Sequence, residues 1–404
     1  MIGISKLYCG TVEPSDVLRY GRKSAALPSH LLQFSEDKLP VIAWNVTRAC
    51  NLSCFHCYAS ATPAKAPDEL SPSEAMGLVR SLTGYGVPVI LFSGGEPLLR
   101  RDVFALIEAA VLGGSRAVLS TNGLLLDREA AARLARIGLS YVGISLDGLE
   151  ERHDAMRKMP GAFRGALMAV TTAQEAGLKV GLRLTLTRSN RNDIDGVFAL
   201  MEERAIPRVC FYHLVDTGAG PELSSETLSH DETRAAVGRI AELTAEAFSR
   251  GFRPEVLTVD NQADGPFLYL KMKAEGRDRE AENALSLLRL NGGSSSGHGI
   301  GCVSWNGDVH PDQFWRSVRL GSVRERPFPA IWNDRSDSFL TALKDKKTHL
   351  RGRCRECRFL DVCGGGLRAR AAHATGDPWA PDPACYLSDS EIGRGAGRPL
   401  AAGA

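Results

Sequence analysis

Long apolar runs are absent from this 404-residue sequence, and so is an excess of charge of either sign. No stretch approaches the roughly 20 apolar residues that a membrane-spanning helix needs. Lysine and arginine together number 49 and aspartate and glutamate 47, which leaves a formal net charge of +2. A general nucleic-acid binder carries a clear basic excess. We therefore expect neither a membrane nor a nucleic acid as a partner.

A secretory signal is also lacking, because the N-terminal residues show no basic segment followed by an apolar one. Hydrophobic residues make up 44% and charged residues 24%, which is typical of a soluble globular protein of two or three domains. We expect a cytoplasmic protein. The ten cysteines are grouped rather than spread as pairs. In a reducing compartment, such grouping favours metal ligation over disulfides.

The first cysteine group comprises Cys50, Cys54 and Cys57 in the spacing C-x3-C-x2-C, followed at once by Tyr58. It comes directly after residues 41–46, which are predicted to form a buried strand. A [4Fe–4S] cluster takes four ligands, usually all thiolates, so three neighbouring cysteines leave one iron open. A zinc knuckle is the alternative, although zinc sites usually combine two C-x2-C pairs.

The second cysteine group has the spacing C-x2-C-x5-C-x21-C and comprises Cys354, Cys357, Cys363 and Cys385. Four thiolates would complete the ligand set of a second [4Fe–4S] cluster. A structural zinc site is the competing interpretation of the same residues.

Between the two groups, strands and helices alternate. Predicted strands cover residues 41–46, 88–92, 117–120, 141–146, 180–186 and 209–214. Their apolar character predicts an α/β fold with a parallel sheet covered by helices. Six units are fewer than the eight of a closed TIM barrel. Functional residues are expected at the C-terminal ends of the strands.

We divide the chain into five segments from these patterns. They are an N-terminal extension (1–39), a partial barrel (40–216), connecting helices and linker (217–298), an iron–sulfur domain (299–390) and a disordered tail (391–404). The iron–sulfur domain begins with a hairpin around Asn306-Gly307, which predicts a type I′ turn.

Cys50, Cys54, Cys57 and Tyr58 resemble the signature of the radical S-adenosylmethionine (SAM) enzymes. The resemblance implies a six-stranded partial (β/α)6 TIM-like barrel and a [4Fe–4S] cluster whose open iron binds SAM. It also implies reductive cleavage of SAM to a 5′-deoxyadenosyl radical, which abstracts a hydrogen atom, and a reducing electron donor such as a ferredoxin or flavodoxin. The chemistry belongs to the cofactor, and the protein positions and shields it.

Residues at four predicted strand ends are candidates for binding SAM. Gly94-Gly95-Glu96 resembles the motif whose backbone and glutamate hold the SAM amino group in that family. Asp147 could bind a ribose and Arg183 the SAM carboxylate. Ordinary turn or surface roles remain the alternatives for these residues. The complete predicted SAM site consists of Tyr58, Gly94, Gly95, Glu96, Asn122, Ser145, Asp147 and Arg183.

The second cysteine group resembles the SPASM/Twitch extension of radical SAM maturases. Some members hold a further auxiliary cluster through cysteines near the hairpin. Here His310-Pro-Asp312 and Ser294–Ser296 occupy the corresponding places, which implies a single auxiliary cluster. Cys302 is interpreted as a buried strand residue, with ligation of a cluster left open.

The stretch Asn306–Trp315 is similar to the hairpin of radical SAM enzymes acting on modified haems, most of all the NirJ family of haem d1 biosynthesis. This resemblance implies removal of propionate side chains from 12,18-didecarboxysiroheme. An enzyme of the siroheme-dependent haem pathway and a SPASM-type peptide maturase are the alternatives. For a tetrapyrrole bearing carboxylates, the candidate substrate-binding residues are His213, His298, His310 and Arg316, with Phe314 and Trp315 as walls.

Overall fold

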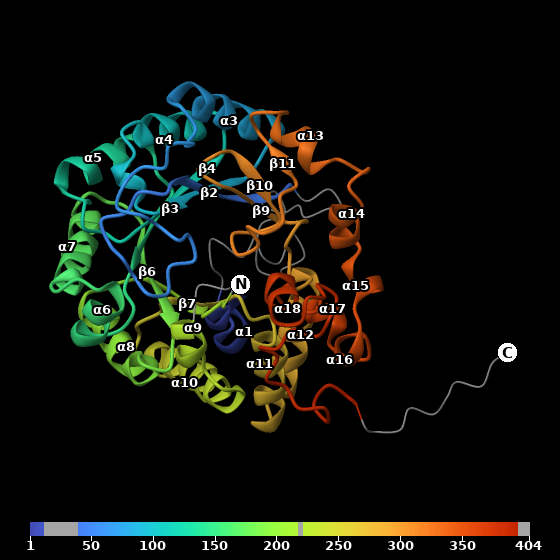
Figure 1. Cartoon of the computed structure of the whole chain (residues 1–404). Coiled ribbons are helices and arrows are strands. Elements are labelled where there is room, and N and C mark those ends of the chain that lie inside the picture. The colour runs from blue at the N-terminus through green and yellow to red at the C-terminus, as the bar shows by residue number, and fades with distance from the viewer. Residues whose placement is uncertain (12–38, 217–220, 395–404) are drawn as a thin grey trace.

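The computed structural model describes residues 1–11, 39–216 and 221–394 (Figure 1). Its strands form one sheet in the order β1-β8-β7-β6-β5-β4-β3-β2-β9-β10-β11. Neighbouring strands from β8 through to β9 pair in parallel, whereas β1, β10 and β11 pair antiparallel. The strands are β1 (Ile2–Gly3), β2 (Val41–Thr47), β3 (Val89–Gly94), β4 (Arg116–Thr121), β5 (Tyr141–Ser145), β6 (Val180–Leu186), β7 (Arg208–His213), β8 (Glu255–Val259), β9 (Ile300–Val303), β10 (Asp308–His310) and β11 (Gly321–Ser322).

The six predicted strand ranges coincide with β2 to β7 to within two residues at each end, which confirms the α/β class. The sheet is longer than predicted, because β8 and β9 extend its parallel part on either side. Strand β8 lies in the segment that was predicted to hold only connecting helices and linker. Its five residues are all buried, but the run is short and opens with Glu255, which pairs with Arg208 at 3.0 Å.

Helices cover the outer side of the sheet, and Figure 1 shows α3 to α8 as an arc around the strands. Capping boxes at Ser71–Glu74 and Ser229–Glu232 begin α3 and α10. The helices up to the end of the connecting segment are α1 (Ile4–Cys9), α3 (Pro72–Tyr85), α4 (Val103–Leu112), α5 (Arg128–Ile137), α6 (Glu150–Arg157), α7 (Ala162–Glu175), α8 (Ile194–Glu203), α9 (Pro221–Glu226), α10 (His230–Ser249), α11 (Asp264–Ala274) and α12 (Asp278–Asn291), with 3-10 turns η2 (Pro97–Leu99) and η3 (Arg191–Asp193).

The core lies between the sheet and these helices. Trp44 and Phe92, on neighbouring strands β2 and β3, are fully buried with ring centroids 5.7 Å apart. Burial on both faces is expected of parallel strands. Because β2 to β8 are parallel, their C-terminal ends lie at the same edge of the sheet, and the packing on both faces fixes the position of that edge.

The hairpin β9–β10 continues the sheet beside β2, but its turn is not type I′. Gly307 has a φ of 89°, whereas Asn306 does not have a positive φ. The Asn306 side chain instead bonds the Asp308 backbone N–H at 3.2 Å. The Gly307 N–H donates to the Ser304 carbonyl at 2.9 Å, as in a type I turn closed by a glycine bulge.

Short helices follow the hairpin and run, in Figure 1, from beside α3 down to α11 and α12. They are α13 (Phe328–Trp332), α14 (Ser338–Lys344), α15 (Lys346–His349), α16 (Gly352–Arg355), α17 (Leu360–Cys363) and α18 (Arg368–Thr375).

Both ends of the described chain contact the rest of the protein. The N-terminal strand β1 pairs with β8, at the edge of the sheet. Ile392 is buried, and Glu391 accepts from Arg234 at 2.6 Å, so residues 391–394 are packed where the predicted tail begins. The rest of that tail and most of the predicted N-terminal extension lie outside the described residues. Among the helices of the described residues, none has the length and apolar character to span a membrane.

Candidate functional site

The first cysteine group lies in the loop directly after β2, where backbone and side-chain N–H groups surround the sulfurs. The Leu52 N–H lies 3.4 Å from Cys50 Sγ, and the Arg157 guanidinium lies 3.5 Å from Cys54 Sγ. Burial raises the pKa of Cys50 to about 11 and also raises that of Cys54. A thiolate at these positions therefore needs a cationic partner, which an iron cluster supplies.

The loop after β3 packs against the backbone that leads into the cysteines. A Cβ at Gly95 would lie 2.1 Å from the Ala49 carbonyl oxygen, and one at Gly94 2.4 Å from that of Thr47. The Gly95 N–H donates to the Thr47 carbonyl at 2.8 Å. These glycines were predicted to admit a ligand, and in the structure they also admit the cysteine loop itself.

Glu96 is completely buried beneath this loop. Its carboxylate accepts from the Asn122 N–H at 2.9 Å, the Thr121 hydroxyl at 2.8 Å and the Leu98 N–H at 3.0 Å. Burial raises its pKa. Glu96 joins the ends of β3 and β4 and does not line the adjoining cavity, so its predicted role in binding the SAM amino group stays a prediction.

Asp147 is also completely buried, and it pairs with two side chains that the sequence did not reveal. His56 Nε2 lies 3.1 Å from its carboxylate, and Arg157 pairs with the same oxygen. Burial opposes ionisation, but these neighbours hold the pKa of Asp147 well below its usual range. The carboxylate thus anchors Arg157 beside Cys54 and does not line the cavity, where it was predicted to meet a ribose.

A cavity of about 1140 Å³ opens above the strand ends, next to the cysteine loop. Arg183 is its most distinctive cation, with its guanidinium 4.6 Å from the centre of the Tyr212 ring. Gly143 makes room for it, since a Cβ there would lie 2.6 Å from Arg183 Cδ. The described residues provide no hydrogen-bond acceptor for Arg183, so it can receive a carboxylate from a ligand. The predicted residues that line the cavity are Cys50, Cys54, Cys57, Tyr58, Gly94, Gly95, Asn122, Ser145, Arg183, His213 and Phe314.

The predicted substrate residues divide into two groups. His213 lines the cavity, whereas both ring nitrogens of His310 are bonded inside the hairpin, to Ser304 at 2.9 Å and to the Val318 carbonyl at 2.8 Å. Arg316 donates to the Ala59 carbonyl at 3.0 Å, and so ties the hairpin to the cysteine loop. Neither His310 nor Arg316 lines the cavity, and nor does His298.

The two predicted aromatic walls also differ. Phe314 lines the cavity and meets Tyr58 edge-on at 5.8 Å. Trp315 is buried against Phe339 instead, so it packs the hairpin.

Two acceptors in the cavity escaped the sequence analysis. Asp260, directly after β8, has a φ of 70°, and its Oδ2 atom has no hydrogen-bond partner among the described residues. Gln313 Oε1 is buried and likewise unpartnered within the described chain. Burial raises the pKa of Asp260 to about 6. Recognising β8 as a strand would have placed Asp260 at the functional edge.

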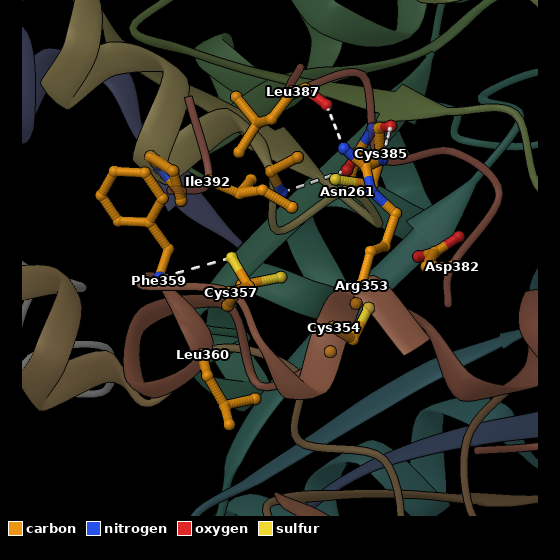
Figure 2. A pocket seen from close by; sticks show the side chains of 15 residues that line it. Asn261, Arg353, Cys354, Cys357, Phe359, Leu360, Asp382, Cys385, Leu387 and Ile392 are labelled. Atoms are coloured by element: carbon orange, nitrogen blue, oxygen red, sulfur yellow. Dashed lines mark hydrogen bonds between the residues drawn. The ribbon is translucent and has the colours of Figure 1, made fainter. Parts of the chain in front are cut away.

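The second cysteine group encloses a smaller cavity of about 470 Å³. Figure 2 shows Cys354, Cys357 and Cys385 around it, and Cys363 completes the lining. Burial raises the pKa of Cys363 well above its usual value and also raises those of Cys357 and Cys385. As in the first group, these thiols require a cationic partner to ionise.

Neither group has the geometry of a single-ion site. Among residues 1–11, 39–216 and 221–394, no three His, Cys, Asp or Glu side chains converge as ligands of one ion would. Zinc–sulfur bonds of about 2.3 Å would bring the thiolates within about 4 Å of one another. In a [4Fe–4S] cluster each thiolate binds a different iron, so the thiolates need not converge on a single ion.

Cys302 lies in β9 and lines neither of the cavities that the two cysteine groups face. It is fully buried, and its Sγ accepts from Asn45 Nδ2 at 3.7 Å. At the place of the missing hairpin cysteines, the Ser296 hydroxyl donates to Asp312 at 2.5 Å. A direct hydrogen bond thus occupies the position where a further cluster would need ligands.

Two family models match the chain, the radical SAM superfamily over residues 44–201 and the SPASM iron–sulfur cluster-binding domain over residues 298–358. The Fe-coproporphyrin III synthase of Methanosarcina barkeri is 55% identical over 97% of this chain and 99% of its own length. The chain belongs to the radical SAM superfamily. It is an enzyme of the SPASM-containing, haem-pathway type, and it uses SAM and [4Fe–4S] clusters.

Other radical SAM relatives agree with this assignment. The pre-heme d1 synthase of Dinoroseobacter shibae is 39% identical, over 88% of each chain. Among solved structures, anSMEcpe with bound AdoMet superposes with a TM-score of 0.67 at 19% identity, covering 88% of this chain and 95% of that one. Streptococcus suis SuiB bound to S-adenosylmethionine superposes with a TM-score of 0.68 at 16% identity, covering 87% of this chain and 78% of that one. These two likenesses concern the fold.

Proposed function

We propose that this radical SAM enzyme modifies the side chains of an iron tetrapyrrole on the way to iron coproporphyrin III. One observation carries the proposal: a single cavity joins the thiols of Cys50, Cys54 and Cys57 to Arg183 and His213. A carboxylate-bearing iron macrocycle needs a cation and a nitrogen ligand beside the site of SAM cleavage.

In this proposal Cys50, Cys54 and Cys57 hold the cluster that binds SAM. When bound, the cluster and SAM supply reductive cleavage of SAM and hydrogen-atom abstraction. Arg157 stabilises the Cys54 thiolate, and Asp147 holds Arg157 in place. The remaining cavity residues from the predicted SAM site, Tyr58, Gly94, Gly95, Asn122, Ser145 and Arg183, bind and orient SAM or the substrate carboxylates.

The second cluster is assigned to Cys354, Cys357, Cys363 and Cys385, because all four line one buried cavity. The electron that reduces the first cluster would come from a ferredoxin or flavodoxin. Both cysteine groups must stay reduced for ligation, so we place the reaction in the cytoplasm.

Iron coproporphyrin III is preferred as product because the similarity to a synthase of that name, at 55% identity, covers nearly the whole chain. Formation of a haem d1 precursor by propionate removal, favoured from the sequence, becomes the second candidate, supported by 39% identity to a pre-heme d1 synthase. The two candidates predict different masses for the product.

The test is an anaerobic incubation of the reconstituted enzyme with 12,18-didecarboxysiroheme, SAM and dithionite. We expect 5′-deoxyadenosine together with a product of the mass and retention of iron coproporphyrin III. The mass of a propionate-removal product would favour the haem d1 candidate. 5′-Deoxyadenosine without any tetrapyrrole binding, measured as a Soret shift, would exclude both.

A further inference from the structure

His213 lies at the junction of the two largest cavities described here. It is the last residue of β7, and it lines both the cavity above the cysteine loop and a neighbouring cavity of about 1240 Å³. Leu214 is likewise shared by both cavities. A ligand that occupies both cavities therefore lies against His213, where the two cavities adjoin.

A buried network fixes the orientation and tautomer of this histidine. His213 Nε2 lies 2.8 Å from Asp264 Oδ2, and the Tyr386 hydroxyl donates to Asp264 Oδ1 at 2.7 Å. Asp264 is completely buried, and an ionised carboxylate only accepts hydrogen bonds. Nε2 of His213 consequently carries the ring proton, and Nδ1 carries the lone pair.

Nδ1 has no hydrogen-bond partner among the described residues. A neutral imidazole whose other nitrogen donates to a carboxylate has the arrangement of a metal-ligating histidine. The carboxylate increases the basicity of the ligand and prevents rotation of the ring. The two other nearby histidines of the second cavity lack this arrangement: His230 bonds the Pro383 carbonyl, and His373 lies 4.0 Å from Asp216 near the surface.

We propose that His213 Nδ1 is the axial ligand of the substrate iron, with Asp264 and Tyr386 as positioning residues. The inference rests on the proposed function, because it presupposes an iron tetrapyrrole as substrate. It adds that the enzyme recognises the metal itself and not only the macrocycle and its carboxylates. A metal-free macrocycle of the same shape is therefore bound more weakly.

The test is titration of cluster-loaded protein with iron(III) coproporphyrin III in buffers free of imidazole. Soret absorption and electron paramagnetic resonance of the ferric iron report a nitrogen ligand directly, without turnover. The variants are His213→Ala and Asp264→Asn, and metal-free coproporphyrin III serves as a second probe. His373→Ala is the matched control, because His373 lines the second cavity without a buried carboxylate partner.

We expect the nitrogen-ligand spectrum in wild type and His373→Ala, its loss in His213→Ala and its return when imidazole is added to that variant. Asp264→Asn presents an N–H to the ring, reverses the tautomer and should weaken iron-dependent binding about 10- to 100-fold. All of these proteins should bind the metal-free macrocycle alike.

Two other outcomes are informative and differ from each other. An unchanged ferric spectrum in folded, cluster-loaded His213→Ala would overturn the axial ligand and leave the proposed function standing. A wild-type protein that binds neither probe would overturn the proposed function, and the axial ligand with it.

Discussion

A buried ion pair beside Cys54 determines the electrostatics of the first cysteine group at the residue scale. Asp147 is completely buried, and Arg157 links it to the Cys54 sulfur. The positive charge favours the thiolate, and the carboxylate keeps the arginine charged in a site from which water is largely excluded. The pairing of Asp147 with Arg157 could not be read from the sequence, because Arg157 lies on α6 and only packing brings that helix back to the end of β5.

Replacing Arg157 with methionine should damage both stability and cluster loading. Removing one partner of a buried pair leaves an uncompensated charge, which costs about 3–5 kcal/mol in the free energy of unfolding. We also expect the iron content to fall toward that of one cluster. The control is Arg152→Ala, because Arg152 is an exposed arginine on the same helix. Equal iron content in both variants would contradict a role for Arg157 at Cys54.

A second residue-scale prediction concerns Asp260, whose pKa burial raises to about 6. A carboxyl group with a raised pKa in the folded state contributes stability at low pH, and that contribution is lost as pH rises through about 6. Asp260→Asn should therefore increase the free energy of unfolding at pH 8 by about 2–3 kcal/mol, which is measured as a higher thermal midpoint. The same substitution should have little effect at pH 4. Equal effects at both pH values would mean that Asp260 titrates normally.

At the scale of elements, the contact between the end of β3 and the cysteine loop explains why Gly94 and Gly95 stand together there. A side chain at Gly95 would displace the Ala49 carbonyl, which belongs to the peptide bond that joins Ala49 to Cys50. Backbone carbonyls cannot move as a flexible side chain can, so the whole cysteine loop must shift. The glycines are thus required by packing whether or not a ligand approaches them.

Gly95→Ala should accordingly lower the iron of the first cluster and leave the second intact. Iron per chain after reconstitution would fall from about eight toward about four. Gly77→Ala is the control, because Gly77 is exposed within α3 with open space around it, and alanine there should stabilise the helix by about 0.5–1 kcal/mol. Full iron loading in Gly95→Ala would show that the loop tolerates the shift.

The elements themselves were largely predictable, since apolar strands and capping boxes are local signals. Strands β2 to β7 and helices α3 and α10 follow from such signals. Strand β8 did not, because five residues opening with a glutamate resemble a loop until β7 and β1 are seen on either side. The cysteine groups were found by spacing. The contacts of Arg316 and His310 could not be predicted, because they depend on how the hairpin folds back.

At the scale of the whole molecule, the C-terminal segment helps to build the cavity above the C-terminal ends of the parallel strands. Gln313 and Phe314 from beyond the hairpin line it, and Arg316 fastens that segment to the cysteine loop. The second cysteine group encloses a separate cavity formed by α16, α17 and the chain around Cys385. Each cysteine group therefore has its own wall of protein, while the cavity above the strand ends is lined by both parts of the chain.

This separation predicts that the two clusters can be removed independently. Cys50, Cys54 and Cys57 changed together to alanine should leave about four irons and abolish SAM cleavage.

Cys354→Ala and Cys363→Ala should lose the second cluster yet still form some 5′-deoxyadenosine, because no residue of the first cavity is altered. Product formation should fail in these two variants if the second cluster exchanges an electron with the substrate. The measurements are the iron count, the 5′-deoxyadenosine yield and the product yield. About eight irons in the triple variant would contradict the first ligand set. A wild-type product yield in Cys354→Ala would reduce the second cluster to a structural support.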